Sequence, residues 1–430
     1  MIDFRSISSE LRSTLEAVAF PEVALVEQRL ETPPPIDDVA AAVRQALRDV
    51  EMPQGSVAIG IGSRGIARID AIAAALVREI GARGGRPFVV PAMGSHGASN
   101  AEGQVRVLEH LGMTEATLGC PIRATMETVS IGRTAAGVEV FMDRHAFGAD
   151  AVVVLNRVKL HTSFRGALES GPAKMLAIGL GKQDGARSVH APGWEAMAGN
   201  LAAAAQVVLD TGKVAFGLAI IENAGEQPCR FVALPAARLL VEEAKLLEEV
   251  RALFPALPFD ALDVLVVDRV GKNISGAGGD PNVTGRFPSR HISGRLKVAR
   301  LVYLGFTAQG DGNGNGVGLA DVVTADLVDA YRPSATYLNA LTTTTAENAR
   351  LPMVMPTREL AVAAALKLVP GLADSREARL VRILDTLHVA RFWASRSALA
   401  ELERAATDFE IVAPFRPFSP NDEAQLPSFA

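Results

Sequence analysis

Three histidines and one lysine are the residues of this sequence best suited to do chemistry. His96 lies in a Gly/Ser/Ala turn, His161 follows a predicted strand, and Lys174 and His190 come next along the chain. A neutral imidazole with an ordinary pKa of about 6.5 can accept a proton near pH 7 and return it as the acid. Two imidazoles on opposite faces of a carbon centre could remove and replace a proton from either side. This is the minimum apparatus for a racemase or epimerase.

Histidine alone is not enough for every substrate of such an enzyme. The Cα–H of an unactivated 2-hydroxy acid is very poorly acidic, and an imidazole cannot remove that proton. Hydride chemistry on a cofactor would be needed for a substrate of this kind.

The composition is that of an ordinary globular protein, and it excludes some classes of binding partner. At 430 residues the chain is too long for one compact core, which predicts two domains. A net charge of −5, without any block rich in Lys or Arg, provides no basic surface for nucleic acid. We therefore expect a small-molecule partner and no nucleic acid.

The cysteines and the N-terminal sequence indicate the compartment. Cys120 and Cys229 lie far apart and form no CxxC pattern, which argues against a disulfide scaffold and suits a reducing cytosol. Residues 1–5 lack the basic segment and apolar core of a secretory signal. No uncharged apolar run reaches about 18 residues, the length that spans a membrane. We expect a cytoplasmic protein that does not enter a membrane.

Strand patterns alternate with helical patterns along most of the chain, which predicts the α/β class. The first part has predicted strands at 57–61, 87–90, 138–141, 151–155 and 214–221, and predicted helices at 37–50, 67–80, 102–111 and 194–209. The second part has predicted strands at 263–268 and 300–304, and predicted helices at 319–330, 359–368 and 397–406. We expect two domains, each a largely parallel sheet flanked by helices, with a cleft between them.

The boundaries of these domains follow from the pattern and from proline-rich breaks. Residues 1–260 are predicted to form a domain that carries the cofactor and the catalytic histidines. Residues 261–400 are predicted to form a smaller α/β domain. Residues 401–430 are predicted to be a helix and a tail that pack back on the surface.

Candidate side chains follow three separate strands of the first domain. Ser63 and Arg64 follow the strand at 57–61, His96 follows the strand at 87–90, and His161 follows the strand at 151–155. Ligands of open α/β sheets bind outside the carboxyl ends of the strands. We therefore expect these side chains to converge on one sheet edge, facing a cleft.

Two glycine-rich segments look like nucleotide motifs but are incomplete. Gly60–Gly65 fits GxGxxG, yet the next strand ends at 88–92 without the acidic residue that would hold a ribose. A tight turn that presents backbone N–H groups and Arg64 to an anion is the better interpretation. Gly179–Gln183 lacks the first Walker glycine and the Ser/Thr after its lysine, so it is not a P-loop.

As a set, these residues resemble the lactate racemase LarA family of nickel-pincer-nucleotide enzymes. Ser63–Gly65 stands where the family has Thr-Arg-Pro, and Gly94–Gly97 where it has a Gly-Thr-His-Arg run. His161 ends a strand as in the family's His-Phe segment. Ser170–Lys174 resembles Ser-Gly-Gly-x-Lys, and His190 lies 16 residues beyond the lysine (190 − 174), the family's spacing. The resemblance covers roughly residues 55–195.

The resemblance implies a cofactor and roles for the site residues. Lys174 would hold Ni(II)-pyridinium-3,5-bisthiocarboxylate mononucleotide (the nickel-pincer nucleotide) through a thioamide, and His190 would complete the square plane of the nickel. Gly62, Ser63 and Arg64 would contact anionic groups of the cofactor or substrate. His96 and His161 would alternate as base and acid on the substrate hydroxyl while hydride moves to and from the pincer. Cofactor-synthesis enzymes would be partners of the protein.

Departures from the family pattern bear on the substrate. Gly271–Ser275 matches a family turn, but the positions of the family's lactate-gripping tyrosine, glutamine and lysine read Ala277, Gly278 and Pro281. A 2-hydroxy acid other than lactate is therefore expected. Candidate substrate contacts, besides Arg64, are Lys272, Asn273, Asp280, Asn282 and Arg286.

Two other classes of function remain open on the sequence. A metal-dependent hydrolase could use His96, His161 and His190 around zinc, although no carboxylate partner stands near them in the sequence. A non-catalytic binder of nucleotides or phosphorylated metabolites could use the glycine-rich turns and Arg64. Fold alone does not separate these alternatives from a racemase.

Overall fold

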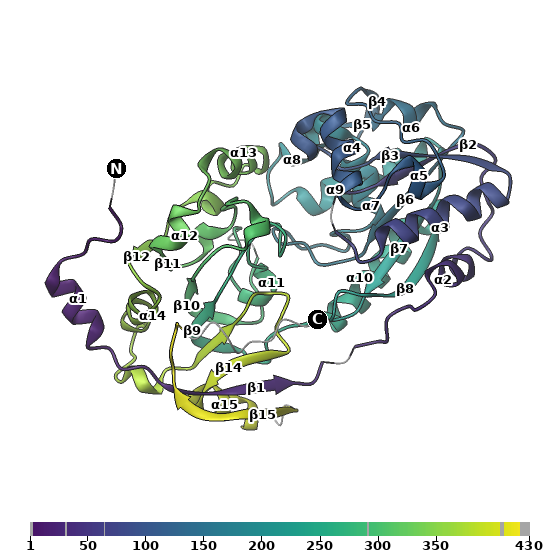
Figure 1. Ribbon diagram of the computed structural model, residues 1–430. Coiled ribbons are helices and arrows are strands. Elements are labelled where there is room, and N and C mark those ends of the chain that lie inside the picture. The colour runs from purple at the N-terminus through teal and green to yellow at the C-terminus, as the bar shows by residue number, and fades with distance from the viewer. Residues whose placement is uncertain (1–2, 31, 64, 290–291, 405–407, 422–430) are drawn as a thin grey trace. The chain divides into compact units, whose positions relative to one another are not determined.

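A computed structural model describes residues 3–30, 32–63, 65–289, 292–404 and 408–421 of the chain. The chain divides into two compact units (Figure 1). One comprises residues 31–254, and the other comprises residues 1–30 together with residues 255–430. The α/β class predicted from the sequence is confirmed, and each unit has its own sheet. The predicted cleft between domains stays a prediction.

The unit of residues 31–254 is built on a five-stranded sheet. Its strand order is β3 (Gly85–Pro91), β2 (Gly55–Ile61), β6 (Ala151–Arg157), β7 (Val214–Glu222) and β8 (Pro228–Pro235). The first four strands are parallel and β8 is antiparallel to β7. The carboxyl ends of β3, β2 and β6 therefore meet at one edge. The predicted strand at 138–141 belongs instead to a separate antiparallel pair, β4 (Thr128–Arg133) with β5 (Glu139–Asp143).

Helices cover both faces of this sheet. They are α2 (Val39–Ala46), α3 (Ile69–Ala82), α4 (Ala101–His110), α5 (Glu115–Leu118), α6 (Arg144–Gly148), α7 (Pro172–Lys174), α8 (Lys182–His190), α9 (Met197–Asp210) and α10 (Leu239–Leu253). Apolar residues of α2 and α3 share a core with Val57, Ile59 and Ile61 of β2. On the opposite face Gly217 lets α7 approach, since an added Cβ there would lie 2.8 Å from the Cβ of Pro172.

The second unit has an eight-stranded mixed sheet. Its order is β12 (Met353–Met355), β11 (Val322–Thr324), β10 (Lys297–Tyr303), β9 (Ala261–Val267), β13 (Leu380–Ile383), β14 (Arg391–Ser395), β1 (Glu22–Gln28) and β15 (Phe409–Pro417). Pairing is parallel from β12 to β13 and antiparallel from β13 to β15. Its helices are α1 (Ser9–Glu16), α11 (Pro281–Thr284), α12 (Ala325–Asp329), α13 (Pro333–Thr343), α14 (Arg358–Lys367) and α15 (Arg396–Arg404).

The structure differs from the predicted division at both ends of the chain. Residues 1–30, predicted to belong to the first domain, supply β1 to the sheet of the other unit. Figure 1 shows β1 beside β14 and β15, which the N-terminal colour makes easy to follow. The predicted surface tail forms β15, which pairs with β1 along residues 409–417. A short apolar run in the sequence does not indicate which strand, several hundred residues away, will pair with it.

Among the described residues, no helix is both long enough and apolar enough to cross a membrane.

Removal of residues 1–28 should loosen the C-terminal strand, because β1 is the only neighbour of β15 in the sheet as described. We expect chymotrypsin to cleave after Phe409 or Phe415 much faster in the truncated protein, as measured by mass spectrometry of the fragments. Cleavage within residues 32–254 should be unchanged. Equal protection of residues 409–417 in both proteins would contradict the pairing.

Candidate active site

The turns after β2 and β3 meet at the sheet edge, as predicted. The Ser63 hydroxyl forms a short hydrogen bond with Nδ1 of His96. An added Cβ at Gly62 would lie 3.3 Å from Cε of Met175, the residue after Lys174. The Gly62–Ser63 turn therefore lies beside the lysine segment. Arg64 falls outside the described residues.

The segment that carries Lys174 is held by its backbone. Lys159 N–H donates to the Ser170 carbonyl at 2.9 Å, and the Asn156 side-chain amide donates to the Gly171 carbonyl at 3.3 Å. These bonds fasten the start of α7 to the end of β6. Lys174 itself is partly buried at the last position of α7.

Glu243, on α10, is a buried carboxyl group beside this segment. Its Oε2 accepts a hydrogen bond from Ala173 N–H at 2.7 Å, and an added Cβ at Gly171 would lie 2.3 Å from its Oε1. Burial raises the pKa of Glu243 to about 8, against a small opposing effect of the Ala173 N–H. Glu243 was not predicted as a site residue, because the sequence of α10 is that of an amphipathic helix and Glu243 is one of several glutamates in it.

A helical segment joins Lys174 to His190 but does not run straight. The π-helix η2 (Met175–Gly179) follows α7, and α8 begins at Lys182, whose φ of 53° is left-handed. A straight α-helix would separate positions 174 and 190 by about 24 Å. Instead α8 turns back on η2, and an added Cβ at Gly185 would lie 3.6 Å from the Ala177 carbonyl oxygen. A left-handed residue other than glycine costs roughly 1–2 kcal/mol, so neighbouring contacts must stabilise this turn.

His190 is the last residue of α8, and the hydrogen of its neutral ring has a defined position. Its Nδ1 lies 2.7 Å from the Ala186 carbonyl oxygen. Because a carbonyl only accepts, Nδ1 carries the hydrogen and Nε2 of the neutral ring is left with its lone pair. Burial lowers the pKa of His190, the Ala186 carbonyl opposes this, and the positive charge of Lys174 lowers the pKa further. A neutral imidazole with a bare Nε2, in electrostatic contact with an amine, suits a metal ligand.

Trp194 joins the histidines of this site. Its ring centroid lies 5.6 Å from that of His190 and 5.9 Å from that of His161. Phe164 packs against His161 at 4.4 Å. The structure therefore brings together His161 and His190 around one indole. Sequence reasoning placed Trp194 only in a helix, although a tryptophan four residues after a candidate ligand, in a chain with two tryptophans, was an available signal.

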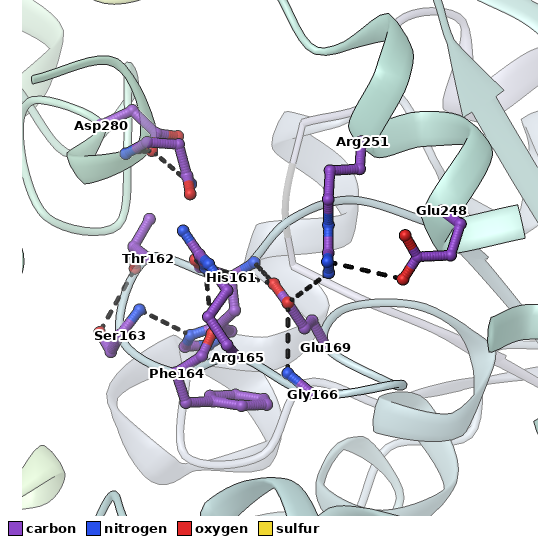
Figure 2. Close-up of polar contacts among 11 residues, drawn as sticks. His161, Thr162, Ser163, Phe164, Arg165, Gly166, Glu169, Glu248, Arg251 and Asp280 are labelled. Carbon is purple, nitrogen blue, oxygen red and sulfur yellow. Dashed lines mark hydrogen bonds and ion pairs between the residues drawn. The ribbon is translucent and has the colours of Figure 1, made fainter. Parts of the chain in front are cut away.

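The loop of His161 is organised by Glu169 (Figure 2). The buried carboxylate accepts from His161 N–H at 2.6 Å and from Arg251 of α10 at 3.1 Å, and it lies 3.4 Å from the Arg165 guanidinium. Burial raises the pKa of Glu169, and these donors oppose the shift. Glu169 was not predicted from the sequence as a partner of His161, and its hydrogen bond is to the His161 backbone N–H.

The His161 ring has the opposite proton position to His190. Ser163 N–H donates to Nδ1 of His161 at 3.1 Å. Nδ1 is therefore an acceptor, and the hydrogen of the neutral ring lies on Nε2. A neutral His161 can donate a proton from Nε2, whereas His190 can accept a ligand bond there.

The predicted substrate residues lie at the carboxyl end of β9 in the other unit. Lys272 Nζ donates to the Gly276 carbonyl at 2.8 Å, and Asn273 Oδ1 accepts from the Thr307 hydroxyl at 2.6 Å. Asp280 caps α11, and Arg286 forms an ion pair with Asp321 at 2.7 Å. These four contacts are within that unit, and the roles of Lys272, Asn273, Asp280 and Arg286 toward a substrate stay predictions.

Within the residues described here, no group of three or more His, Cys, Asp or Glu side chains could hold a metal ion. A zinc hydrolase built on His96, His161 and His190 therefore finds no support in this part of the chain.

Together, the fold and the site describe an α/β protein with a separate sheet in each of two units and with a lysine whose charge acts on a partly buried imidazole. Residues 21–196 match the family described as "Lactate racemase N-terminal domain". This part of the chain is similar to that family, and the predicted resemblance to LarA is confirmed. The family supports an isomerase of the racemase type.

The chain is also similar to a solved structure. It is the lactate racemase apoprotein from Thermoanaerobacterium thermosaccharolyticum, with 10% sequence identity, a TM-score of 0.43, and coverage of 85% of this chain and 88% of that chain. A search of curated protein sequences finds no match.

Glu243 makes stability depend on pH in a direction that can be tested. Its folded pKa of about 8 exceeds the ordinary 4.5, so its stabilising effect is full below about pH 4.5 and is lost as pH rises through about 8. The difference is on the order of 5 kcal/mol across this window. In Glu243→Gln, which keeps an acceptor for Ala173, thermal unfolding from about pH 5 to about pH 9 should show a weaker loss of stability with pH.

The control for this experiment is Glu248→Gln, on the same helix but 66% exposed. It should keep the pH dependence of the unchanged protein. The same slope in Glu243→Gln would show that Glu243 does not bind a proton in this range.

Proposed function

We propose that this protein is a racemase or epimerase of a 2-hydroxy acid that carries a nickel-pincer nucleotide on Lys174. The feature that carries the proposal is an electrostatic interaction between two groups sixteen positions apart in the sequence. The Lys174 charge acts on the His190 imidazole, which is neutral and keeps Nε2 bare. Membership of the lactate racemase N-terminal domain family supports the same reaction class.

The donor set fits this cofactor better than it fits a protein-bound metal. The charge of one amine, Lys174, acts on one imidazole, His190, and the described residues hold no cluster of three metal-ligating side chains. A metal held here would need most of its ligands from the cofactor itself. When bound, the nickel-pincer nucleotide would supply these ligands and a hydride acceptor, with Lys174 as its covalent anchor and His190 as the protein ligand.

His96 and His161 would handle the proton of the substrate hydroxyl. His161 holds its hydrogen on Nε2, since Nδ1 is occupied by Ser163 N–H, and can donate it to an alkoxide oxygen. The hydrogen bond to Ser63 fixes the orientation of the His96 ring through Nδ1, which leaves Nε2 as the atom that exchanges a proton. Ser63 and the Gly62 backbone, with Arg64, would bind anionic groups of the cofactor or substrate.

The substrate is proposed to be a small 2-hydroxy acid other than lactate. Ala277, Gly278 and Pro281 stand where the family places its lactate-gripping side chains, and none of them can donate a side-chain hydrogen bond. Lys272 and Asn273 are proposed as substrate contacts in their place, with Asp280, Asn282 and Arg286 as further candidates.

The proposed setting is a reducing cytoplasm, where cofactor-synthesis enzymes would load the protein. Both cysteines are free thiols. Burial raises the pKa of the Cys120 thiol to about 11, so it is a poor nucleophile at neutral pH.

Intact mass spectrometry of the denatured protein tests the anchor. Protein from cells that make the pincer should carry a covalent adduct, and Lys174→Ala should have the mass of the bare polypeptide. Lys159→Ala, with a lysine removed from the same sheet edge, should keep the adduct. An adduct that persists in Lys174→Ala, or a bare mass for the unchanged protein, would contradict the proposal.

Nickel content and the rate of racemisation test the other roles. His190→Ala should keep the covalent adduct but lose most of its nickel on gel filtration, measured by elemental analysis. His161→Gln and His96→Gln should keep adduct and nickel while slowing interconversion of the two enantiomers of the 2-hydroxy acid, measured by chiral chromatography, by roughly 100-fold or more. Binding of mononucleotides without racemisation of any hydroxy acid would favour the non-catalytic alternative instead.

A further inference from the structure

Lys182 is a buried lysine that the proposed reaction does not use. Its side chain is 0% exposed, and it belongs to the glycine-rich segment 179–183 that resembles a P-loop without being one. A solvent-excluded ammonium is costly unless it is paired, so its partners show what it does.

The Lys182 ammonium has three partners from three elements. Nζ forms an ion pair with Asp143 Oδ2 at 3.0 Å, donates to Gln104 Oε1 at 3.0 Å, and makes a short hydrogen bond to the Pro91 carbonyl. Two of these contacts are hydrogen bonds and the third is an ion pair, and all three partners are oxygen atoms that favour the charged ammonium group. They tie the start of α8 to the end of β3, to α4 and to the end of β5.

Gln104 extends this network to the loop of His96. Its side chain is 0% exposed, and its amide donates to the Gly94 carbonyl at 2.9 Å and to the His96 carbonyl at 3.3 Å. The oxygen of the Gln104 amide is held by Lys182, which fixes the direction of these donors. The backbone on both sides of Ser95 is thereby connected to the ammonium.

The same lysine sets the direction of the helix that ends at His190. Lys182 is the left-handed residue at which the helical segment reverses. The Asp143 N–H also donates to the Leu180 carbonyl at 2.6 Å, two residues before the reversal. An added Cβ at Gly94 would lie 3.7 Å from the Cβ of Ala186, whose carbonyl holds the His190 ring. The loop of His96 and the body of α8 therefore pack on each other.

We propose that Lys182 is a positioning residue whose buried ammonium, with Asp143 and Gln104, holds the loop of His96 and the helix of His190 in one arrangement. The proposal deepens the proposed function and rests on it only for the roles of the two histidines. Lys182 acts through its neighbours, because its ammonium is buried among protein oxygen atoms of Asp143, Gln104 and Pro91.

The test is the imidazole nitrogen spectrum of the full-length, cofactor-free protein labelled with ¹⁵N-histidine. His96 and His190 are assigned with the single variants His96→Gln and His190→Gln. The double variant Asp143→Asn/Lys182→Met removes both charges together, so neither is left unpaired, and Asn keeps the oxygen that caps α6. Its His96 and His190 signals should shift, while His388, in the other unit, should not.

A second variant separates the two branches of the network. Gln104→Met leaves the ion pair of Lys182 and Asp143 intact but removes the link to Gly94 and His96. The His96 signals should shift and the His190 signals should stay in place. This variant also tests the proposal if the double variant does not fold.

The matched control removes another buried ion pair, Asp268 with Arg382, by Asp268→Asn/Arg382→Met. It should cost stability without moving the signals of His96 or His190. Unchanged His96 signals in folded Gln104→Met would overturn the proposal, as would unchanged His96 and His190 signals in the folded double variant. Because the spectra need neither cofactor nor substrate, they are independent of the success of the proposed function.

Discussion

The candidate site depends on the reversal of one helical segment. Lys174 and His190 lie at its two ends, and a straight helix would keep them too far apart to share a ligand. The left-handed conformation of Lys182 turns the segment back, and α8 then packs closely on η2 at Gly185. Burial of an ion pair at the turn stabilises a backbone conformation that a lysine would otherwise avoid.

Helix α10 supports the other side of the site. Its Glu243 accepts a hydrogen bond from the lysine segment, and its Arg251 binds the carboxylate that holds the His161 loop. Helix α10 thus holds both the segment of Lys174 and the loop of His161 in place. The proton positions on the rings follow from backbone contacts alone, since Ala186 and Ser163 fix the tautomers of His190 and His161 in opposite senses.

The sequence predicted the parts of this protein that depend on local pattern. Buried strands such as 57–61 and 151–155 were found close to their observed bounds, because parallel strands buried on both faces are continuous apolar runs. The candidate histidines and lysine were also predicted from the sequence, because they follow predicted strands or have the spacing of the family motif. Glu169, Glu243 and the burial of Lys182 could not be predicted, because their importance comes from tertiary contacts. The place of β1 between β14 and β15 was missed for the same reason.

The most direct test of the central claim is the pKa of His190 in the cofactor-free protein, measured by NMR titration. The account holds that Lys174 and His190 share one site, where the lysine charge lowers the histidine pKa. Lys174→Met should therefore raise the pKa of His190, and Lys159→Met should leave it unchanged. A His190 pKa that stays the same without the Lys174 charge would contradict the account.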